Sequence, residues 1–402
     1  DNFRSRWGRR HPLLVAGALP TTALFLALFA PPQGMSEMGI FAWLLGVSIL
    51  LRTTLTVYFV PYTAMGAELS TDYDQRTTIA KARVTLGWIA GMALPAIAFT
   101  FFFQPQNGID GRLVAENYWY YGILSAAVAG VTALICIMGT RSVIPWLPVA
   151  AAKAPFKWTD PYNDIIGVCV NRNFRISIGS SLAFGMSTGA YATLSLYLAT
   201  YFWELSVAQL AGFVVPTAIA TLFAFMVLGP LGRRFDKPTL MAAFSLVLAS
   251  NSVWLFGGRL FDVLPANNHP MLYSLLLVNT GIAVFSIVCL QIMSASFAAD
   301  ILDELQLQTG KRQEGVIFAV GAFLSKATIG AGALIAGVVI QWVGIQSDSL
   351  PGQVPADVLQ SLGWFTLIIV AGFSMIGFGF TTQFRLNRDD HAKLRKTLDA
   401  TA

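Results

Sequence analysis

Ten long apolar stretches constrain this chain more than any other feature of its sequence. A helix needs about 20 apolar residues to cross a bilayer, and the stretches that meet this length lie at about 12–31, 40–66, 84–104, 118–140, 176–202, 208–230, 239–257, 271–297, 316–343 and 361–384. They are continuous rather than alternating, which favours helices over the strands of a closed barrel. Charged residues make up 12% of the chain, against about 25% in soluble domains. The predicted fold class is all-α, in a polytopic membrane protein.

The basic residues predict how these helices are oriented. If the loop 1–11 is cytoplasmic, 22 of the 26 Lys and Arg residues fall on the cytoplasmic side, and the other side holds only Arg112 and Arg259. This asymmetry follows the positive-inside rule. It places loop 1–11 and the C-terminus in the cytoplasm, with the protein in the plasma (inner) membrane. It also explains the net charge of +5 without a nucleic-acid partner.

The positions of the acidic residues and histidines limit the classes of function that the chain can have. None of the 21 acidic residues lies within a predicted span, whereas a cation-coupled carrier usually keeps a carboxylate in the membrane. Either this protein needs none, or its carboxylates lie upstream of Asp1. The three histidines, His11, His269 and His391, are scattered over loops or tails, which argues against a membrane enzyme. The three cysteines show no metal or redox spacing, and no cofactor is expected.

A hydrophilic stretch at 141–175 divides four spans from six. A basic, glycine-containing turn at 229–238 resembles the segment 1–12, and the two would hold matching places if two spans preceded Asp1. Two six-helix halves are the architecture of the major facilitator superfamily, and ten of the twelve helices would then lie in this chain. The predicted domains are 1–140 (helices 3–6), 141–175 (cytoplasmic central loop), 176–384 (helices 7–12) and 385–402 (cytoplasmic tail).

Polar residues recur along one side of the span 40–66. Arg52, Thr56, Phe59 and Thr63 follow the spacing i, i+4, i+7, i+11, which places them on one helical stripe. A stripe with a cation and two hydroxyls is costly against lipid, so we expect it to face the interior of the bundle. Arg52 has an alternative role as a structural tether that pairs with backbone carbonyls.

Lys326 lies about ten residues inside the span 316–343. A lysine at mid-membrane costs roughly 3 kcal/mol or more, so it needs a partner or a wet cavity; a structural ion pair is the alternative. Gly330, Ala333 and Gly337 continue its face and predict a close approach of another helix. Asn279, Gln291 and Ser294 of the span 271–297 could line a cavity or make helix–helix hydrogen bonds.

Four segments resemble the glycoside–pentoside–hexuronide:cation symporter family. They are Asp1 to Pro12, with its Arg-Ser-Arg-Trp-Gly loop; Pro61-Tyr62 through Glu68-Leu69, Asp72-Tyr73 and Arg76-Thr77; Asp300-Ile301-Leu302-Asp303 with Thr309 to Gly315; and Lys326. The resemblance implies twelve helices, alternating access, and uptake of a sugar or related solute driven by Na⁺, Li⁺ or H⁺.

The resemblance also implies residue roles. It assigns cation coupling to Thr56 and Lys326, with carboxylates upstream of Asp1 and no metal in this chain beyond possible Na⁺ at Thr56. It places Arg83 near the sugar cavity. Galactoside binders of the family have aspartate and tryptophan where this chain has Phe59 and Thr63, and a tryptophan at Gln291. The predicted substrate-binding residues are therefore Arg52, Phe59, Thr63, Arg83, Gln291 and Lys326. The predicted substrate is another glycoside, an acidic sugar or a non-sugar rather than a galactoside.

Charged residues of the cytoplasmic loops are predicted to gate the transporter. Asp1 with Arg4, Arg6, Arg9 and Arg10, and Asp300 and Asp303 with Lys311 and Arg312, can form inter-helix ion pairs that close the inner face and break on inward opening. In the alternative interpretation, these charges set topology and solvate the loops.

Together these features predict a secondary active transporter and not an enzyme. Its function is cation-coupled (Na⁺ or H⁺) symport of a sugar, a glycoside or a related small organic solute across the plasma membrane by alternating access. The alternatives are a lysolipid or amphiphile symporter of the same fold and an uncoupled facilitator. Its expected partners are the small-molecule substrate and the lipid bilayer, and we expect a monomer.

Overall fold

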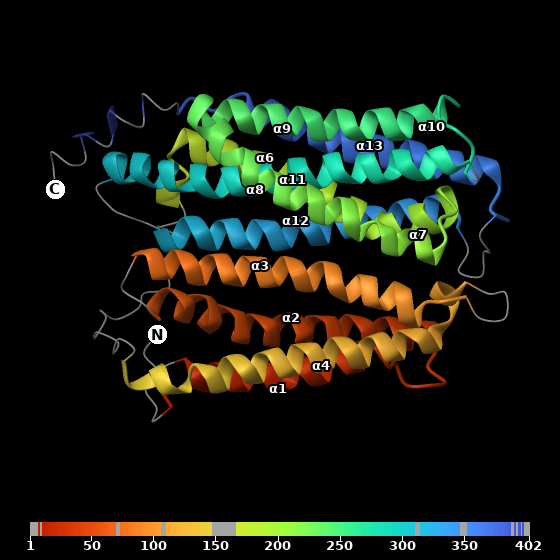
Figure 1. Cartoon of the computed structure of the whole chain (residues 1–402), viewed down its shortest axis with the longest axis horizontal. Coiled ribbons are helices and arrows are strands. Elements are labelled where there is room, and N and C mark those ends of the chain that lie inside the picture. Colours follow the sequence, from red (N-terminus) through yellow and green to blue (C-terminus); the bar gives the residue numbers. More distant parts are fainter. Residues whose placement is uncertain are drawn as a thin grey trace. The chain divides into compact units, whose positions relative to one another are not determined.

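The structure is a computed structural model of the chain. It describes residues 7–8, 10–69, 73–105, 110–146, 166–267, 269–309, 314–345 and 352–386, together with 390, 393, 394, 396 and 397. Every regular element within these residues is a helix, which confirms the all-α fold class. The chain forms two compact units, an N-terminal unit (Asp1–Pro155) and a C-terminal unit (Phe156–Ala402) (Figure 1).

The N-terminal unit is built around α1, which packs against both α2 and α4. A Cβ atom at Gly17 of α1 would lie 2.7 Å from the backbone nitrogen of Tyr58 in α2, so the two helices touch through their backbones. Such small-residue contacts support helix association in lipid. The helices of this unit are α1 (His11–Phe29), α2 (Glu37–Glu68), α3 (Tyr73–Ile97) with a π-helical end (Ala98–Phe102), and α4 (Ala115–Gly139), with 3₁₀ turns at Gly111–Leu113 and Arg141–Trp146.

The C-terminal unit has α6 at its centre, packed against α12 and α13, while α8 and α9 both pack against α11. Its helices are α6 (Arg172–Tyr197) with a π-helical end (Leu198–Phe202), α7 (Val207–Gly212), α8 (Val214–Arg234), α9 (Lys237–Ser252), a π-helical segment (Val253–Gly257), α10 (Gly258–Leu260), α11 (Pro270–Thr309), α12 (Glu314–Val343) and α13 (Ala356–Thr381).

Each of the ten predicted stretches coincides with a helical segment, and eight of these segments, among the described residues, are long and apolar enough to cross a membrane. The stretch 84–104 gives a shorter apolar helix, Leu86–Phe102. The stretch 176–202 forms α6, whose hydroxyl residues lower its hydropathy. Ser180 and Ser187 of α6 are buried inside the C-terminal unit, which explains how a central helix can be less apolar than its neighbours. The chain is therefore a multi-pass membrane protein.

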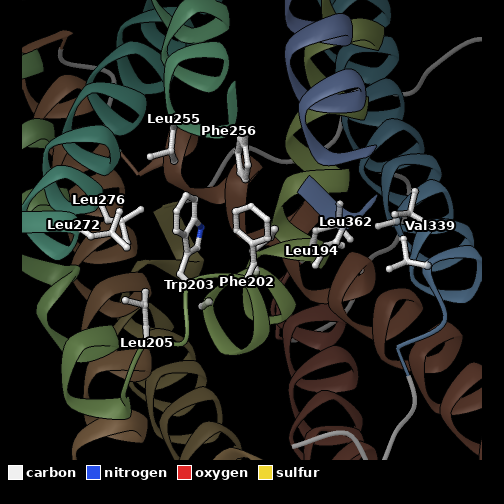
Figure 2. Packing of buried hydrophobic residues seen from close by; sticks show 14 residues of the cluster. Leu194, Phe202, Trp203, Leu205, Leu255, Phe256, Leu272, Leu276, Val339 and Leu362 are labelled. Carbon is white, nitrogen blue, oxygen red and sulfur yellow. The ribbon is translucent and has the colours of Figure 1, made fainter. Parts of the chain in front are cut away.

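One end of the C-terminal unit is fixed by a hydrophobic cluster that joins α6, α11, α12 and α13 through residues such as Leu194, Leu272, Val339 and Leu362 (Figure 2). At its centre the rings of Phe202 and Trp203 meet edge to face, with centroids 4.7 Å apart. The cluster holds the ends of the helices in register, and α6 and α12 go on to form the cavity described below.

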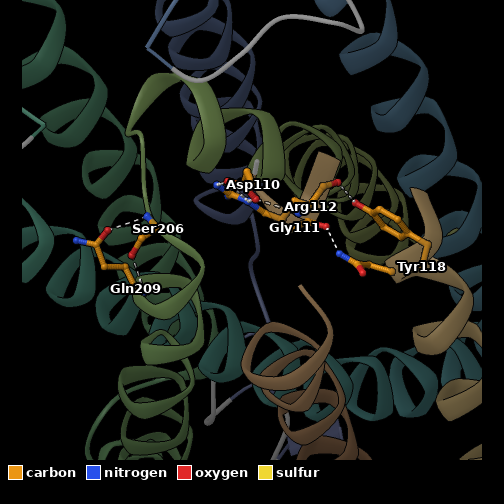
Figure 3. A network of polar contacts seen from close by, with 7 residues as sticks. Asp110, Gly111, Arg112, Tyr118, Ser206 and Gln209 are labelled. Atoms are coloured by element: carbon orange, nitrogen blue, oxygen red, sulfur yellow. Dashed lines mark hydrogen bonds and ion pairs between the residues drawn. The ribbon is translucent and has the colours of Figure 1, made fainter. Parts of the chain in front are cut away.

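The loop between α3 and α4 is held by a buried ion pair (Figure 3). Arg112 donates from Nη2 and Nε to the carboxylate of Asp110, at 2.5 and 2.9 Å, and its own backbone N–H donates to the same carboxylate. Tyr118 donates to the carbonyl of Arg112 at 2.9 Å. Burial disfavours the charged form of Asp110, but the hydrogen bonds and charge of Arg112 outweigh it and hold the pKa of this carboxyl below its usual value.

We expect Asp110→Asn to destabilise this loop by about 1–3 kcal/mol at neutral pH, because the guanidinium of Arg112 loses a buried charged partner. Asparagine keeps a side-chain oxygen that can accept from the backbone N–H of Arg112, so the variant removes the negative charge and keeps this hydrogen bond. The pKa of Asp110 is lower in the folded state than in the unfolded state. The stabilisation by its ion pair with Arg112 is therefore complete above the pKa of an unfolded carboxyl, about 3.9, and is lost as pH falls through the folded-state pKa. The thermal unfolding difference between wild type and variant should therefore shrink towards zero in acid. A constant difference at all pH values would contradict the assignment.

Candidate functional site

A cavity of about 340 Å³ lies within the C-terminal unit, between α6, α9, α11 and α12. Its wall carries seven side chains with hydroxyl or amide groups: Ser180, Ser181, Thr188, Gln291, Ser294, Ser325 and Thr328. The rest of the wall is apolar, with Phe184 and Met241 among it, and no described lining residue has an ionisable side chain. The cavity can therefore accept and donate several hydrogen bonds to an uncharged solute.

Glycines bring two walls of the cavity together. A Cβ at Gly189 of α6 would lie 2.5 Å from the carbonyl oxygen of Ile329, and one at Gly332 of α12 would lie 2.6 Å from the carbonyl oxygen of Met186. Gly185, four residues before Gly189, leaves room for the side chain of Thr328, whose hydroxyl a Cβ there would meet at 2.0 Å. The pair Gly185 and Gly189 thus forms a small-xxx-small contact of the kind that allows close helix packing in membranes.

This close approach does not use the face that the sequence predicted. Gly330 and Gly337 have no atom within 4 Å of an added Cβ, so they are not the contact points. The contact runs through Gly332, which is buried, whereas Gly330 and Gly337 are exposed. Within the C-terminal unit the close approach of α12 thus uses Gly332, and an approach to the face of Gly330, Ala333 and Gly337 stays a prediction.

The other side of α6 is held against α13. The hydroxyl of Ser187 donates to the carbonyl of Val370 and lies 3.0 Å from the hydroxyl of Ser374. The ring of Phe184 covers Gly377, at 2.6 Å from the position of an added Cβ. These contacts fix α6 from both sides, which keeps its hydroxyl groups aimed at a cavity of defined shape.

Only some of the residues predicted on α11 and α12 line the cavity. Gln291 of α11 lies in the wall of the cavity, as does Ser294. Lys326 of α12 is not among the lining residues, although its neighbour Ser325 is, and the lysine is exposed. Asn279 does not line the cavity: its side chain donates to the backbone carbonyl of Asn251, and Asn251 donates back to that of Asn279, both at 3.0 Å. For Asn279 the structure thus shows the helix–helix alternative.

The polar stripe of α2 lies on a helical face that the N-terminal unit leaves uncovered. Arg52, Thr56 and Phe59 are exposed and Thr63 is half-buried. The buried face of α2 runs instead through residues such as Leu51. The stripe is therefore not packed into the interior of its own unit, and a role in a cavity stays a prediction.

The hydroxyls of the stripe bond to their own helix. Thr56 donates to the carbonyl of Arg52 at 2.8 Å, and Thr63 donates to that of Phe59 at 3.0 Å. A threonine hydroxyl oxygen is a possible ligand for a cation, and the coupling role of Thr56 stays a prediction. Within the described residues no group of three or more His, Cys, Asp or Glu lies together.

Two tyrosines of α2 were not predicted as site residues. Tyr58 and Tyr62 stack with centroids 5.9 Å apart, and Arg83 of α3 is half-buried. The hydroxyl residues of α6 in the cavity wall were also missed. Ser181, Phe184 and Thr188 follow the spacing i, i+3, i+7 and so lie on one face of α6. This spacing, together with the low hydropathy of α6, is the sequence signal that could have identified them.

Of the predicted gating residues, three are described. Asp300 of α11 accepts from the Nζ of Lys237 in α9 at 2.6 Å, a partner that the sequence analysis did not name. Asp303 is buried, and so is Arg10. Asp1, Arg4, Arg6, Arg9, Lys311 and Arg312 lie outside the described residues, so the predicted pairs with them stay predictions.

The chain is similar in sequence to known sugar transport proteins. A family model described as MFS/sugar transport protein matches residues 1–388. The chain is 23% identical to a lactose permease of Leuconostoc lactis over 100% of its own length and 62% of the permease. It is 22% identical to a lactose permease of Lactobacillus helveticus, over 99% of its own length and 60% of that protein.

A third relative is the protein named "Putative glycoside/cation symporter YagG" of Escherichia coli (strain K12). The identity is 25%, over 90% of the chain and 73% of the relative. The chain therefore spans less than two thirds of the length of the two lactose permeases that it matches.

Proposed function

The chain belongs to the MFS/sugar transport protein family, and we propose that it carries out cation-coupled symport of a sugar or glycoside by alternating access. The relatives support the resemblance to the glycoside–pentoside–hexuronide:cation symporters, since one of them is named as a glycoside/cation symporter and two as lactose permeases. Na⁺ or H⁺ is the proposed coupling ion.

The observation that carries the proposal is the uncharged, hydroxyl- and amide-lined cavity of the C-terminal unit. A sugar presents many hydroxyl groups, each able to donate and accept, together with an apolar ring face. Side chains such as Ser180, Thr188 and Gln291 can pair with the hydroxyls, and Phe184 offers an apolar surface to the ring. An acidic sugar or a lysolipid phosphate would find no cation among these lining residues, so the cavity favours a neutral sugar.

We place the protein in the plasma membrane, with loop 1–11 and the C-terminus in the cytoplasm. The distribution of basic residues supports this orientation. The multi-pass helices are consistent with either orientation.

Uptake into proteoliposomes tests the function. With an imposed Na⁺ or H⁺ gradient, the protein should concentrate a labelled neutral sugar above its external level. Glycosides without galactose are the first candidates, and lactose, for which two relatives are named, is the comparison. Counterflow without any gradient separates the alternatives: exchange without accumulation would mean an uncoupled facilitator. Transport of lysolipid but of no sugar would overturn the proposal.

We expect Gln291→Ala and Ser294→Ala to raise the apparent KM for the sugar by about 2–10-fold each, since each change removes a hydrogen bond worth about 0.5–1.5 kcal/mol. Thr280→Ala is the matched control on the same helix, because its hydroxyl bonds to the carbonyl of Leu276 and does not line the cavity. Initial uptake rates over a range of sugar concentrations give the KM values. Equal effects of all three changes would remove the cavity from the proposed binding site.

A further inference from the structure

The cavity between α6, α9, α11 and α12 has a polar rim and an apolar floor. Its exposed lining residues, the rim, are mostly polar: Ser181, Thr188, Gln291, Ser294 and Ser325. Its buried and half-buried lining residues, the floor, are mostly apolar: Phe184, Met241, Leu248, Ile287 and Leu290. A ligand that fills the cavity therefore meets hydrogen-bonding groups at the rim and hydrocarbon at the floor.

The rim offers hydroxyl groups that are available to a ligand. The side chains of Ser181, Ser294 and Ser325 make no hydrogen bond to any residue that the structure describes. By contrast, Thr193 and Ser195, farther along α6, donate to carbonyls of their own helix, as serine and threonine in membrane helices commonly do. Each of the three rim hydroxyls keeps its donor and its acceptor lone pairs for the hydroxyl groups of a sugar.

The floor offers far less to a sugar ring. Met241 and Leu290 are only 3% and 8% exposed, and both side chains are apolar. Thr328 is also buried, and its hydroxyl already donates to the carbonyl of Leu324 at 2.7 Å. A hydroxyl group that is buried without a partner is costly, whereas burial of hydrocarbon is favourable. The floor therefore disfavours a second sugar ring and favours an apolar group.

Building on the proposed transport of sugars, we propose that the substrate is a glycoside whose aglycone is a small apolar group. Its sugar ring binds at the rim and its aglycone enters the floor. The cavity volume of about 340 Å³ is near the lower end of the range of about 300–1,000 Å³ for small-ligand pockets. A single aromatic ring or a short alkyl group suits this space better than a long acyl chain.

Uptake of glycosides that share one sugar tests the proposal. Proteoliposomes are supplied with the phenyl glycoside, the methyl glycoside and a disaccharide of glucose, and with the same series for xylose and galactose; empty vesicles give the passive leak. For the sugar that is transported, the phenyl glycoside should have an apparent KM about tenfold lower than the other two, because a hydrophobic pocket discriminates by about 10–200-fold for a small apolar group.

The outcomes separate this proposal from the transport function on which it depends. Equal KM values for the phenyl and methyl glycosides, or the lowest value for the disaccharide, would overturn the apolar aglycone and leave sugar transport intact. Uptake of no member of any series would overturn both.

Polar substitutions in the floor test where the aglycone binds. Leu248→Asn, and independently Ile287→Thr, should raise the KM for the phenyl glycoside several-fold more than that for the methyl glycoside. Ser294→Ala, at the rim, should raise both KM values alike. Leu246→Asn is the matched control on α9, because Leu246 is 43% exposed and does not line the cavity. If Leu248→Asn and Ile287→Thr, with unchanged thermal unfolding temperatures, kept the wild-type ratio of the two KM values, the aglycone would not bind in the floor and the proposal would fail.

Discussion

Replacing Gly332 by leucine is expected to abolish folding of the C-terminal unit. A Cβ there would lie 2.6 Å from the backbone nitrogen of Ala190 and 2.6 Å from the carbonyl oxygen of Met186. Both atoms belong to the backbone of α6, which cannot move aside as a flexible side chain would. Overpacking of a tight core costs typically 1–3 kcal/mol and occasionally more. The cost is larger here because α6 and α12 must separate to admit the side chain.

Separation of these helices would also dismantle the cavity. Ser181 and Thr188 lie on one wall and Ser325 on another, so moving α6 away from α12 breaks their arrangement. The folded fraction, measured by size-exclusion chromatography with tryptophan fluorescence, should fall to background and sugar uptake should vanish with it. Gly337→Leu is the matched control on the same helix, because an added Cβ there meets nothing within 4 Å. A folded, active Gly332→Leu protein would contradict the packing described here.

The helices could be predicted from the sequence because hydrocarbon imposes one strict requirement on the backbone. Each apolar stretch must satisfy its own hydrogen bonds as a helix, and the stretches therefore coincide with observed helices. The packing face was harder to predict. On α12 the glycines at 330, 332 and 337 look equivalent in sequence, and only the neighbouring helix selects Gly332.

The candidate site could be predicted only in part for a similar reason. Gln291 and Ser294 stood out as polar residues in an apolar span, and both line the cavity. Ser180, Ser181 and Thr188 did not, because serine and threonine in a membrane helix commonly bond back to their own backbone, as Thr193 does here. Whether a hydroxyl faces a cavity depends on how α6 is rotated, which the contacts with α12 and α13 decide.

Replacing Lys326 by glutamine is expected to abolish gradient-driven accumulation of the sugar. A lysine within a membrane span costs about 3 kcal/mol on insertion scales, and α12 carries Lys326 inside its apolar segment Val320–Val343. We propose that its charge responds to the bound cation and changes the affinity of the neighbouring cavity, whose wall includes Ser325. Without the charge, sugar should equilibrate across the vesicle membrane, so the internal-to-external ratio should fall to about one.

The structural alternative makes a different prediction for the same variant. If Lys326 only forms an ion pair that holds helices together, Lys326→Gln should lower the thermal unfolding temperature, and the protein that remains folded should still concentrate sugar. If Lys326 couples the cation, the unfolding temperature should change little and counterflow should persist while accumulation is lost. Lys326→Arg tests the positive charge separately from the shape of the side chain, because arginine keeps the charge but alters its geometry. Undiminished accumulation by folded Lys326→Gln would remove this lysine from the coupling mechanism, because a charge that can be deleted without effect cannot link the ion gradient to the sugar.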